Sequence, residues 1–162
     1  MQIEKVVSDA SPFILFSKSG LFELFPALFR EIFIPTAVWN EIDQCEDEAR
    51  ENLYFYKDVL ACCVVDVSAE VLVWNLGEGE TEVLSFARAH KLAYTALVDD
   101  RAARRCAEAL EINSMGTAGI LILAKKRGLI ASVKKELDKV TEAGLWISDD
   151  VVQIIMAEAG EV

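Results

Sequence analysis

Two acidic positions follow apolar segments that are predicted to be strands. Asp9 comes directly after the segment 3–8, and Asp99, with Asp100 beside it, comes after the segment 92–98. In an open parallel sheet, ligands bind beyond the carboxyl ends of the strands. If these two strands are neighbours, their carboxylates meet at one edge of the sheet. Each aspartate alone is as well explained as a cap of the turn or helix that follows it, but the pair indicates a site.

Two glutamates interrupt stripes of small or apolar residues on predicted helices. Glu41 lies on the same stripe as Val38 and Ile42, and Glu80 lies one turn before Val83. Both glutamates are therefore expected to point toward the core side of their helices. An unpaired carboxylate in such a position costs several kcal/mol, so we expect something to compensate its charge.

Two kinds of compensation are open: arginine partners or a divalent cation. Three or four carboxylates close together raise one another's pKa, and Mg²⁺ or Mn²⁺ would keep them ionised. Such an ion activates water for attack on phosphorus and stabilises the departing oxygen. This chemistry needs no catalytic histidine, and the only histidine, His90, is expected at the end of a helix. Glu78 and Glu82, which flank Glu80, lie off its stripe and are expected to face solvent.

Strands alternate with helices along the chain, which indicates an α/β fold with a mostly parallel sheet and helices on both faces. The predicted strands are 3–9, 32–34, 59–67 and 92–98, with a short one at 112–115. The predicted helices are 12–18, 21–29, 36–44, 46–58, 81–90, 100–110, 117–127, 132–142 and 149–158. No repeat or linker divides the chain, so we expect one domain over residues 1–162.

The composition excludes a disordered chain, because 53% of the 162 residues are hydrophobic. The longest uncharged run, 112–124, is too short to span a bilayer, and the acidic residues near the amino terminus do not suit a signal peptide. We therefore expect a cytoplasmic protein with no membrane partner. The four cysteines lack metal-binding spacing and are expected to be buried, reduced thiols, with Cys62 and Cys63 inside the strand 59–67.

The formal net charge of −11 disfavours binding of nucleic acid through bulk charge. However, residues 101–139 hold 9 of the 16 basic residues and only 4 acidic ones. This segment is either an ordinary solvated surface, helped by an Arg104–Glu108 pair at i, i+4, or a local surface that meets phosphates. The candidate nucleic-acid-binding residues are Arg101, Arg104, Arg105, Lys125 and Lys126.

Five sequence blocks between residues 3 and 130 resemble the PIN domain. They are IEKVVSDAS, IPTAVWNEI, LGEGETEVLSFA, ALVDDRAARRCAEAL and GTAGILILAKKRGLI. More closely, they resemble the prokaryotic PIN-like subgroup of predicted nucleic-acid-binding proteins, which is related to VapC-type toxins. The single motifs are weak, but their ordered set is fairly specific. The resemblance implies a three-layer α/β/α sandwich around a mostly parallel sheet, with an acidic cluster that binds Mg²⁺ or Mn²⁺.

The resemblance also implies roles for particular residues. The catalytic and metal-binding acids would be Asp9, Glu41, Glu80 and Asp99, with Asp100 as a further metal ligand. Whether Asp99 or Asp100 is the fourth ligand stays open. The third acid is aspartate in many of the toxins and glutamate here, which changes its reach and keeps its ligand chemistry. Ser11 and Thr117 would be accessory hydroxyls near the same site.

PIN domains are typically endonucleases of single-stranded RNA. The resemblance therefore implies a divalent-metal-dependent ribonuclease that hydrolyses phosphodiester bonds. It implies three partners: single-stranded RNA, a second copy of the chain in a homodimer and, if the protein is the toxin of a toxin–antitoxin pair, an antitoxin protein. The alternative is a catalytically weak or inactive PIN-like module that acts through protein–protein or nucleic-acid binding. A phospho-acceptor signalling domain is disfavoured, because the first strand does not end in two acids and no lysine is suitably placed after the last strand.

Overall fold

Short, largely apolar segments form a five-stranded parallel sheet at the centre of the chain. The computed structural model describes residues 3–162. The strand order is β3-β2-β1-β4-β5, and every neighbouring pair is parallel. The strands are β1 (Lys5–Ser8), β2 (Glu31–Phe33), β3 (Leu60–Ala61), β4 (Thr95–Leu97) and β5 (Ser114–Met115).

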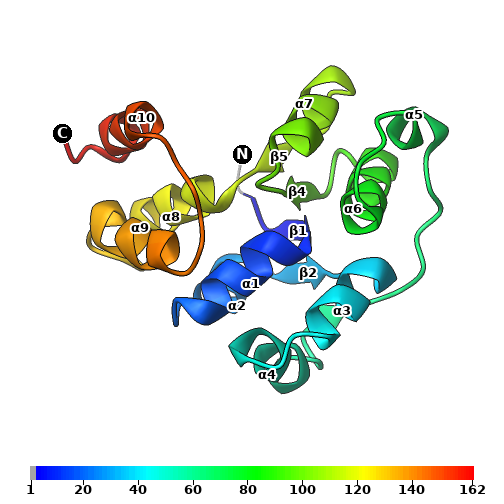
Figure 1. Ribbon diagram of the computed structural model, residues 1–162, viewed down its shortest axis with the longest axis horizontal. Coiled ribbons are helices and arrows are strands. Elements are labelled where there is room, and N and C mark those ends of the chain that lie inside the picture. The colour runs from blue at the N-terminus through cyan, green and yellow to red at the C-terminus, as the bar shows by residue number, and fades with distance from the viewer. Residues whose placement is uncertain (1–2) are drawn as a thin grey trace.

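Helices cover both faces of this sheet. The helices are α1 (Ala10–Lys18), α2 (Leu24–Leu28), α3 (Thr36–Asp43), α4 (Glu48–Phe55), α5 (Ala69–Leu72), α6 (Glu78–Ala89), α7 (Arg101–Ala109), α8 (Thr117–Lys126), α9 (Val133–Glu142) and α10 (Asp149–Ala159). In Figure 1, α6 and α7 lie on one side of the strands, whereas α1, α2 and α8 lie on the other. From β1 the chain adds β2 and β3 on one side of the sheet, and it then returns to add β4 and β5 on the other side. Because each crossover between parallel strands is right-handed, the helices in the crossovers that precede β3 and those in the crossovers that follow it lie on opposite faces of the sheet. The predicted α/β/α sandwich is confirmed.

The central strands position the first pair of predicted acids. β1 pairs with β4 in a register that sets Ser8 opposite Leu97, and the backbone N–H of Asp9 donates to the carbonyl of Leu97 over 3.0 Å. Asp9 and Asp99 therefore follow the carboxyl ends of neighbouring strands, as expected.

The hydrophobic core fixes α1 on the sheet just beyond Asp9. Val6 and Val7 of β1 are fully buried, as are Phe13 and Phe16 of α1. The ring of Phe16 packs against that of Phe25 in α2, with 5.1 Å between their centroids. Burying each of these side chains contributes about 1.5–3 kcal/mol to folding, so the start of α1 is held firmly at the sheet edge.

The segment 59–67 differs from its predicted form as a buried strand. Only Leu60–Ala61 is a strand, and Cys62 and Cys63 are exposed, so the expectation of buried thiols is wrong for these two residues. β3 is an edge strand paired only with β2. Beyond the ladder, the N–H of Ile34 donates to the carbonyl of Ala61 (2.7 Å) and the N–H of Thr36 to the carbonyl of Cys63 (3.3 Å). Because no further strand lies beside this edge among the described residues, the side chains after Leu60 stay open to solvent. Cys106 is buried as expected, and Cys45 is half-buried.

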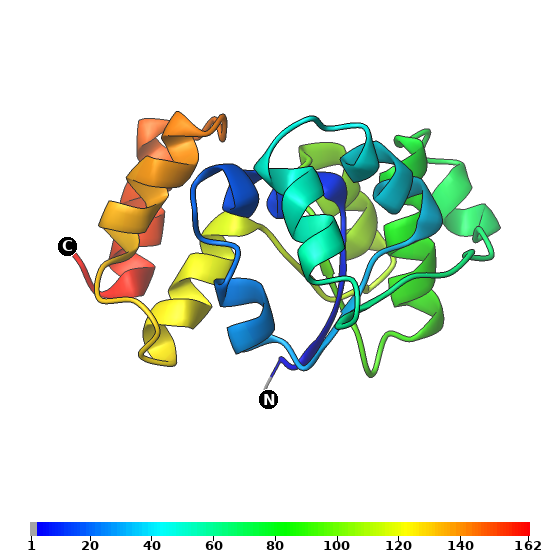
Figure 2. The same cartoon turned by 90° about the horizontal axis from the view of Figure 1, so that it is seen from below.

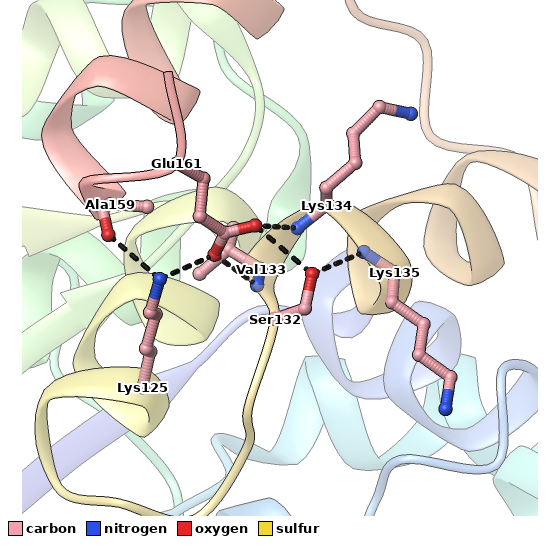
Figure 3. Close-up of polar contacts among 7 residues, drawn as sticks. All are labelled: Lys125, Ser132, Val133, Lys134, Lys135, Ala159 and Glu161. Atoms are coloured by element: carbon pink, nitrogen blue, oxygen red, sulfur yellow. Dashed lines mark hydrogen bonds and ion pairs between the residues drawn. The ribbon is translucent and has the colours of Figure 1, made fainter.

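Helices α8, α9 and α10 gather at one end of the molecule (Figure 2). The carboxylate of Glu161, just after α10, binds the start of α9 (Figure 3). It accepts hydrogen bonds from the backbone N–H groups of Val133 (2.6 Å) and Lys134 (3.1 Å), from the hydroxyl of Ser132 (3.0 Å) and from the ammonium of Lys125 (2.8 Å). These bonds hold the pKa of Glu161 at about 2, with the Lys125 bond the largest cause. The end of the chain is thus tied to α8 and α9.

Within residues 3–162, no helix is both long enough and apolar enough to cross a membrane.

Candidate active site

Asp9 is the most buried of the predicted acids. Its side chain is 6% exposed, and although it occupies the N-cap position of α1 it makes no side-chain capping bond there. Burial raises the pKa of Asp9 to about 7, a hydrogen bond from the backbone of Ala10 opposes this, and the negative charges of Glu80, Glu41 and Asp99 raise it further. The four predicted acids are therefore close enough to affect one another's charge.

Asp99 is held in place by the start of α8. One carboxylate oxygen accepts the backbone N–H of Thr117 (2.7 Å), and the other accepts its hydroxyl (2.7 Å). The hydroxyl of Ser11, at the start of α1, donates to Asp99 over 3.4 Å. The two predicted accessory hydroxyls thus both contact the fourth acid.

Asp100 has a different structural role from Asp99. It is exposed, and its carboxylate caps α7 by accepting the backbone N–H of Ala103 over 3.0 Å. Its charge acts on Glu80, whereas that of Asp99 acts on Asp9. The structure therefore holds Asp99 beside Asp9 and turns Asp100 toward α7.

Glu80 and Gly79 lie in the first turn of α6. The Glu80 carboxylate accepts the backbone N–H of Gly77 (3.3 Å), which stabilises the helix start. Desolvation raises the pKa of Glu80, and the charges of Asp100 and Glu41 add to this rise. A methyl group on Gly79 would lie 3.1 Å from Asp9 Oδ1 and 3.2 Å from Val38, so a larger residue here would require these side chains to shift by a few tenths of an ångström.

Glu41 does not point into the core, which corrects the expectation from its helical stripe. Val38 and Ile42 are fully buried, while Glu41 is exposed at the edge of that stripe. Because α3 packs against α6, this edge faces the start of α6 rather than the core, and Glu41 Oε1 would lie 3.8 Å from a methyl group on Gly79. Glu41 thus reaches the same glycine that borders Asp9.

The expectations for the two flanking glutamates of α6 have different outcomes. Glu78 is exposed, as expected. Glu82 is half-buried instead of facing solvent, and its carboxylate accepts the backbone N–H of Ala37 over 3.3 Å. The reason is that the positive end of the α3 helix dipole lies beside it.

Two hollows meet at this edge of the sheet. The first, which we call the acid pocket, has a volume of ≈ 350 Å³ and is lined by Asp9, Ser11, Glu41, Gly79, Glu80 and neighbouring residues. The second, which we call the arginine cleft, has a volume of ≈ 1080 Å³ and is lined by Asp99, Arg101, Arg104, Arg105, Thr117, Trp146 and neighbouring residues. The Ser11–Asp99 contact joins the residues of one hollow to those of the other.

The acids have no basic partner within the part of the chain that the structure describes. None of the ion pairs among residues 3–162 involves Asp9, Glu41, Glu80 or Asp99. In the same range, no three acidic, histidine or cysteine side chains are arranged so that they could hold a metal ion as they stand. Nevertheless, the donor chemistry suits Mg²⁺ or Mn²⁺, which prefer carboxylate oxygens, and the buried charge of Asp9 lacks compensation.

The predicted basic residues divide into two groups. Arg101, Arg104 and Arg105 are exposed and line the arginine cleft. Lys125 instead pairs with Glu161 (2.8 Å), and Lys126 is exposed at the opposite end of α8 from Thr117. Only the arginines therefore lie beside the acids.

Trp146 is a lining residue of the arginine cleft that sequence reasoning missed. It belongs to the segment between α9 and α10 and is 85% exposed. A single tryptophan in a short connection carries no periodic signal, although its exposure to solvent is unusual for so large an apolar side chain.

Comparison with known proteins agrees with this architecture. No curated protein matches the chain. A family model described as a PIN domain matches residues 5–161, and PIN domains are generally nucleases. Because this match spans the sheet, the acids at its edge and the carboxy-terminal helices alike, the chain belongs to the PIN domain family.

Proposed function

We propose that this protein is a divalent-metal-dependent ribonuclease that hydrolyses phosphodiester bonds in single-stranded RNA. The observation that carries the proposal is the buried carboxyl of Asp9, which has no basic partner among residues 3–162 and lies among three other acids. An arrangement that only stabilised the fold would place an arginine or lysine there.

Asp9, Glu41, Glu80 and Asp99 would hold Mg²⁺ or Mn²⁺, with Asp100 close to Glu80. When bound, such a cation supplies activation of water and stabilises the negative charge that develops on the departing oxygen. Asp99 is already oriented by Thr117 and Ser11. The Glu41 carboxylate is exposed and makes no hydrogen bond or ion pair within the described residues, so it can reorient at little cost.

The arginine cleft gives the substrate a place beside these acids. Arg101, Arg104 and Arg105 follow Asp99 and Asp100 directly in the sequence, and α7 starts at the same edge of the sheet. Guanidinium groups bind phosphate oxygens with two parallel hydrogen bonds. The RNA backbone would therefore lie along α7, with a phosphodiester at the acids.

The test is cleavage of structured and unstructured RNAs in the presence of Mn²⁺. We expect cleavage of unstructured RNA by the parent protein, and rates at least about a hundredfold lower for Asp9→Asn and Glu41→Gln, since each 1.36 kcal/mol of lost charge stabilisation is a factor of ten. Glu23→Gln is the matched control, because Glu23 is exposed next to α2, beyond the far end of α1. It should cleave as the parent does.

Cleavage that survives in Asp9→Asn and Glu41→Gln would overturn the proposal. RNA binding without cleavage by the parent, together with no heat of Mn²⁺ binding near neutral pH, would instead favour the alternative of a non-catalytic PIN-like module.

We extend the proposal to three partners: single-stranded RNA as substrate, a second copy of the chain in a homodimer, and an antitoxin protein if the ribonuclease is a toxin. The support is the family membership and several exposed apolar side chains, among them Phe55, Val73 and Ile154. Light scattering of the purified protein tests the dimer. A small adjacent reading frame whose product binds the protein and blocks cleavage tests the toxin.

A further inference from the structure

One wall of the arginine cleft holds three arginines whose charges are not used by the fold. The side chains of Arg101, Arg104 and Arg105 make no hydrogen bond or ion pair with the other described residues. The Arg104–Glu108 pair, which would have favoured the interpretation as an ordinary solvated surface, is not formed. Every other arginine is engaged. Arg30, Arg50 and Arg88 pair with acids, and Arg127 donates to the carbonyls of Leu28 and Ile3.

Another wall of the arginine cleft, formed by the segment between α9 and α10, carries Trp146. Its side chain is 85% exposed, and it takes part in no ring–ring contact among the described residues, unlike Trp39, whose ring packs on Tyr54. Leaving a tryptophan in water forfeits about 1.5–3 kcal/mol or more of burial free energy. An isolated indole beside unpaired guanidinium groups is the combination with which proteins grip single-stranded nucleic acids, through base stacking and phosphate contacts.

The tryptophan wall is also fixed in position. The backbone N–H of Leu145 donates to the carbonyl of Val140 (3.2 Å), which ties the segment to α9. Ser148 caps α10 through the backbone N–H of Val151 (3.4 Å), and Glu161 fastens the other end of α10 (Figure 3). A backbone that is held in place reduces the entropy lost when a base stacks on the side chain it carries.

We propose that Trp146 is a base-stacking residue that positions single-stranded RNA in the arginine cleft. This inference rests on the proposed function and adds to it the contact that selects unpaired bases. A base that stacks on Trp146 must be free of its complementary strand, whereas the three arginines contact phosphates of any sequence. Asp99 and Thr117 line the same cleft as Trp146, so one bound strand can contact both the indole and the edge of the acid cluster.

The experiment measures RNA affinity without cleavage. The full-length protein is titrated in EDTA, at low salt, into a fluorescently labelled single-stranded RNA of mixed sequence, and into the same RNA carrying one abasic nucleotide at each position in turn. We expect Trp146→Ala to bind the intact RNA roughly 5- to 150-fold more weakly than the parent does, which is the usual range for loss of one stacked base. Trp146→Phe should keep most of the affinity.

The abasic series identifies stacking itself. At the position that contacts Trp146, the abasic RNA should bind the parent as weakly as the intact RNA binds Trp146→Ala, and the variant should lose nothing more. Arg104→Gln should instead weaken binding to all these RNAs alike and lower the salt dependence by about 0.7 in slope. Trp74→Ala is the matched control, because Trp74 is 38% exposed and lies outside the cleft.

Equal RNA affinity of the parent and Trp146→Ala would overturn the inference, as would a loss that is the same for every abasic position. No binding of RNA by the parent would also overturn it and would favour an acidic peptide as the ligand of the cleft. Since these measurements contain no metal, stacking without cleavage in Mn²⁺ leaves this inference standing while the ribonuclease proposal fails. Conversely, if the parent and Trp146→Ala cleave RNA equally well in Mn²⁺ and bind it equally well in EDTA, the ribonuclease proposal stands and this inference fails.

Discussion

Replacing Asp9 by asparagine is expected to make the metal-free protein more stable at high pH. In the folded protein the pKa of Asp9 is raised to about 7, whereas its ordinary value is 3.8. The folded state therefore binds this proton more tightly than the unfolded state does. The resulting stabilisation is fully present below the ordinary pKa, and it is lost as the pH rises through about 7.

The size of the effect follows from the two pKa values. Between pH 5 and about pH 7 the stabilisation from the Asp9 proton falls by about 1.36 kcal/mol per pH unit, over about two pH units, and by pH 8 it is lost. The asparagine side chain of the variant does not titrate, so the difference in unfolding free energy between variant and parent should shift in favour of the variant by about 2.7 kcal/mol over this range. For a chain of this size that is roughly 5–11 °C in Tm.

The assay is thermal and urea unfolding of both proteins in EDTA, at several pH values from 5 to 8. The quantity compared is how the difference in unfolding free energy between variant and parent changes with pH. Any pH-independent effect of the asparagine side chain cancels in this comparison, as does the titration of groups that both proteins share. Asp66→Asn, at an exposed position between β3 and α5 outside the acid pocket, is the control for the same substitution elsewhere in the chain. A difference between Asp9→Asn and the parent that does not change with pH would refute the idea that Asp9 is buried without a compensating charge. Mn²⁺ should raise the parent's Tm at pH 8 and leave that of Asp9→Asn almost unchanged.

Three further substitutions test other parts of the site and its support. Gly79→Ala puts a methyl group 3.1 Å from Asp9 Oδ1. Calorimetry should therefore show an affinity for Mn²⁺ about tenfold lower or worse, while Tm stays within a few degrees of the parent's. Unchanged affinity would contradict this. Thr117→Val removes one of the three hydrogen bonds that the Asp99 carboxylate accepts and should slow RNA cleavage about 10- to 100-fold, while Thr117→Ser should restore the rate. An unaffected rate would show that the orientation of Asp99 is unimportant. Glu161→Gln should lower Tm at pH 7. Because the pKa of Glu161 is lowered to about 2, the Tm difference between variant and parent should be constant at pH values above about 5 and should disappear as the pH falls toward 2. A Tm difference that does not depend on pH would exclude the charge of Glu161 as its cause.

The acids at the sheet edge were predictable because each is fixed by a local pattern. Asp9 and Asp99 end apolar strands, and in a parallel sheet such ends share one edge. Glu80 follows from the apolar stripe of the predicted helix 81–90, one turn before Val83, although the helix begins three residues earlier, at Glu78. What the pattern could not supply is the neighbour that each helix face meets. Glu41 is exposed for that reason, since α3 turns that edge toward α6 instead of the sheet.

The run 59–67 and the Arg104–Glu108 spacing are both local patterns whose outcome depends on surroundings that the local sequence does not specify. The apolar run 59–67 satisfies every local criterion of a buried strand, but it lies at the edge of the sheet, where β2 is its only neighbouring strand among the described residues and residues 61–64 stay exposed. Arg104 and Glu108 have the spacing of an ion pair, yet such surface pairs are worth only a few tenths of a kcal/mol. Competition with solvent at an open cleft is enough to leave Arg104 unpaired.

The two walls of the arginine cleft depend on the chain in different ways. The arginines of α7 begin one residue after Asp100, so their distance from Asp99 is set by the first turns of one helix. Trp146 is separated from the acids by more than forty residues of sequence, and its position depends on α10, which Glu161 holds against α8 and α9. Changes at Glu161 should therefore act on RNA affinity before they act on the rate of cleavage of bound RNA, whereas changes at Asp99 act on the rate. Under the proposed function, this acidic protein would hold a polyanion near a cluster of carboxylates because the three arginines belong to the helix that begins at those carboxylates.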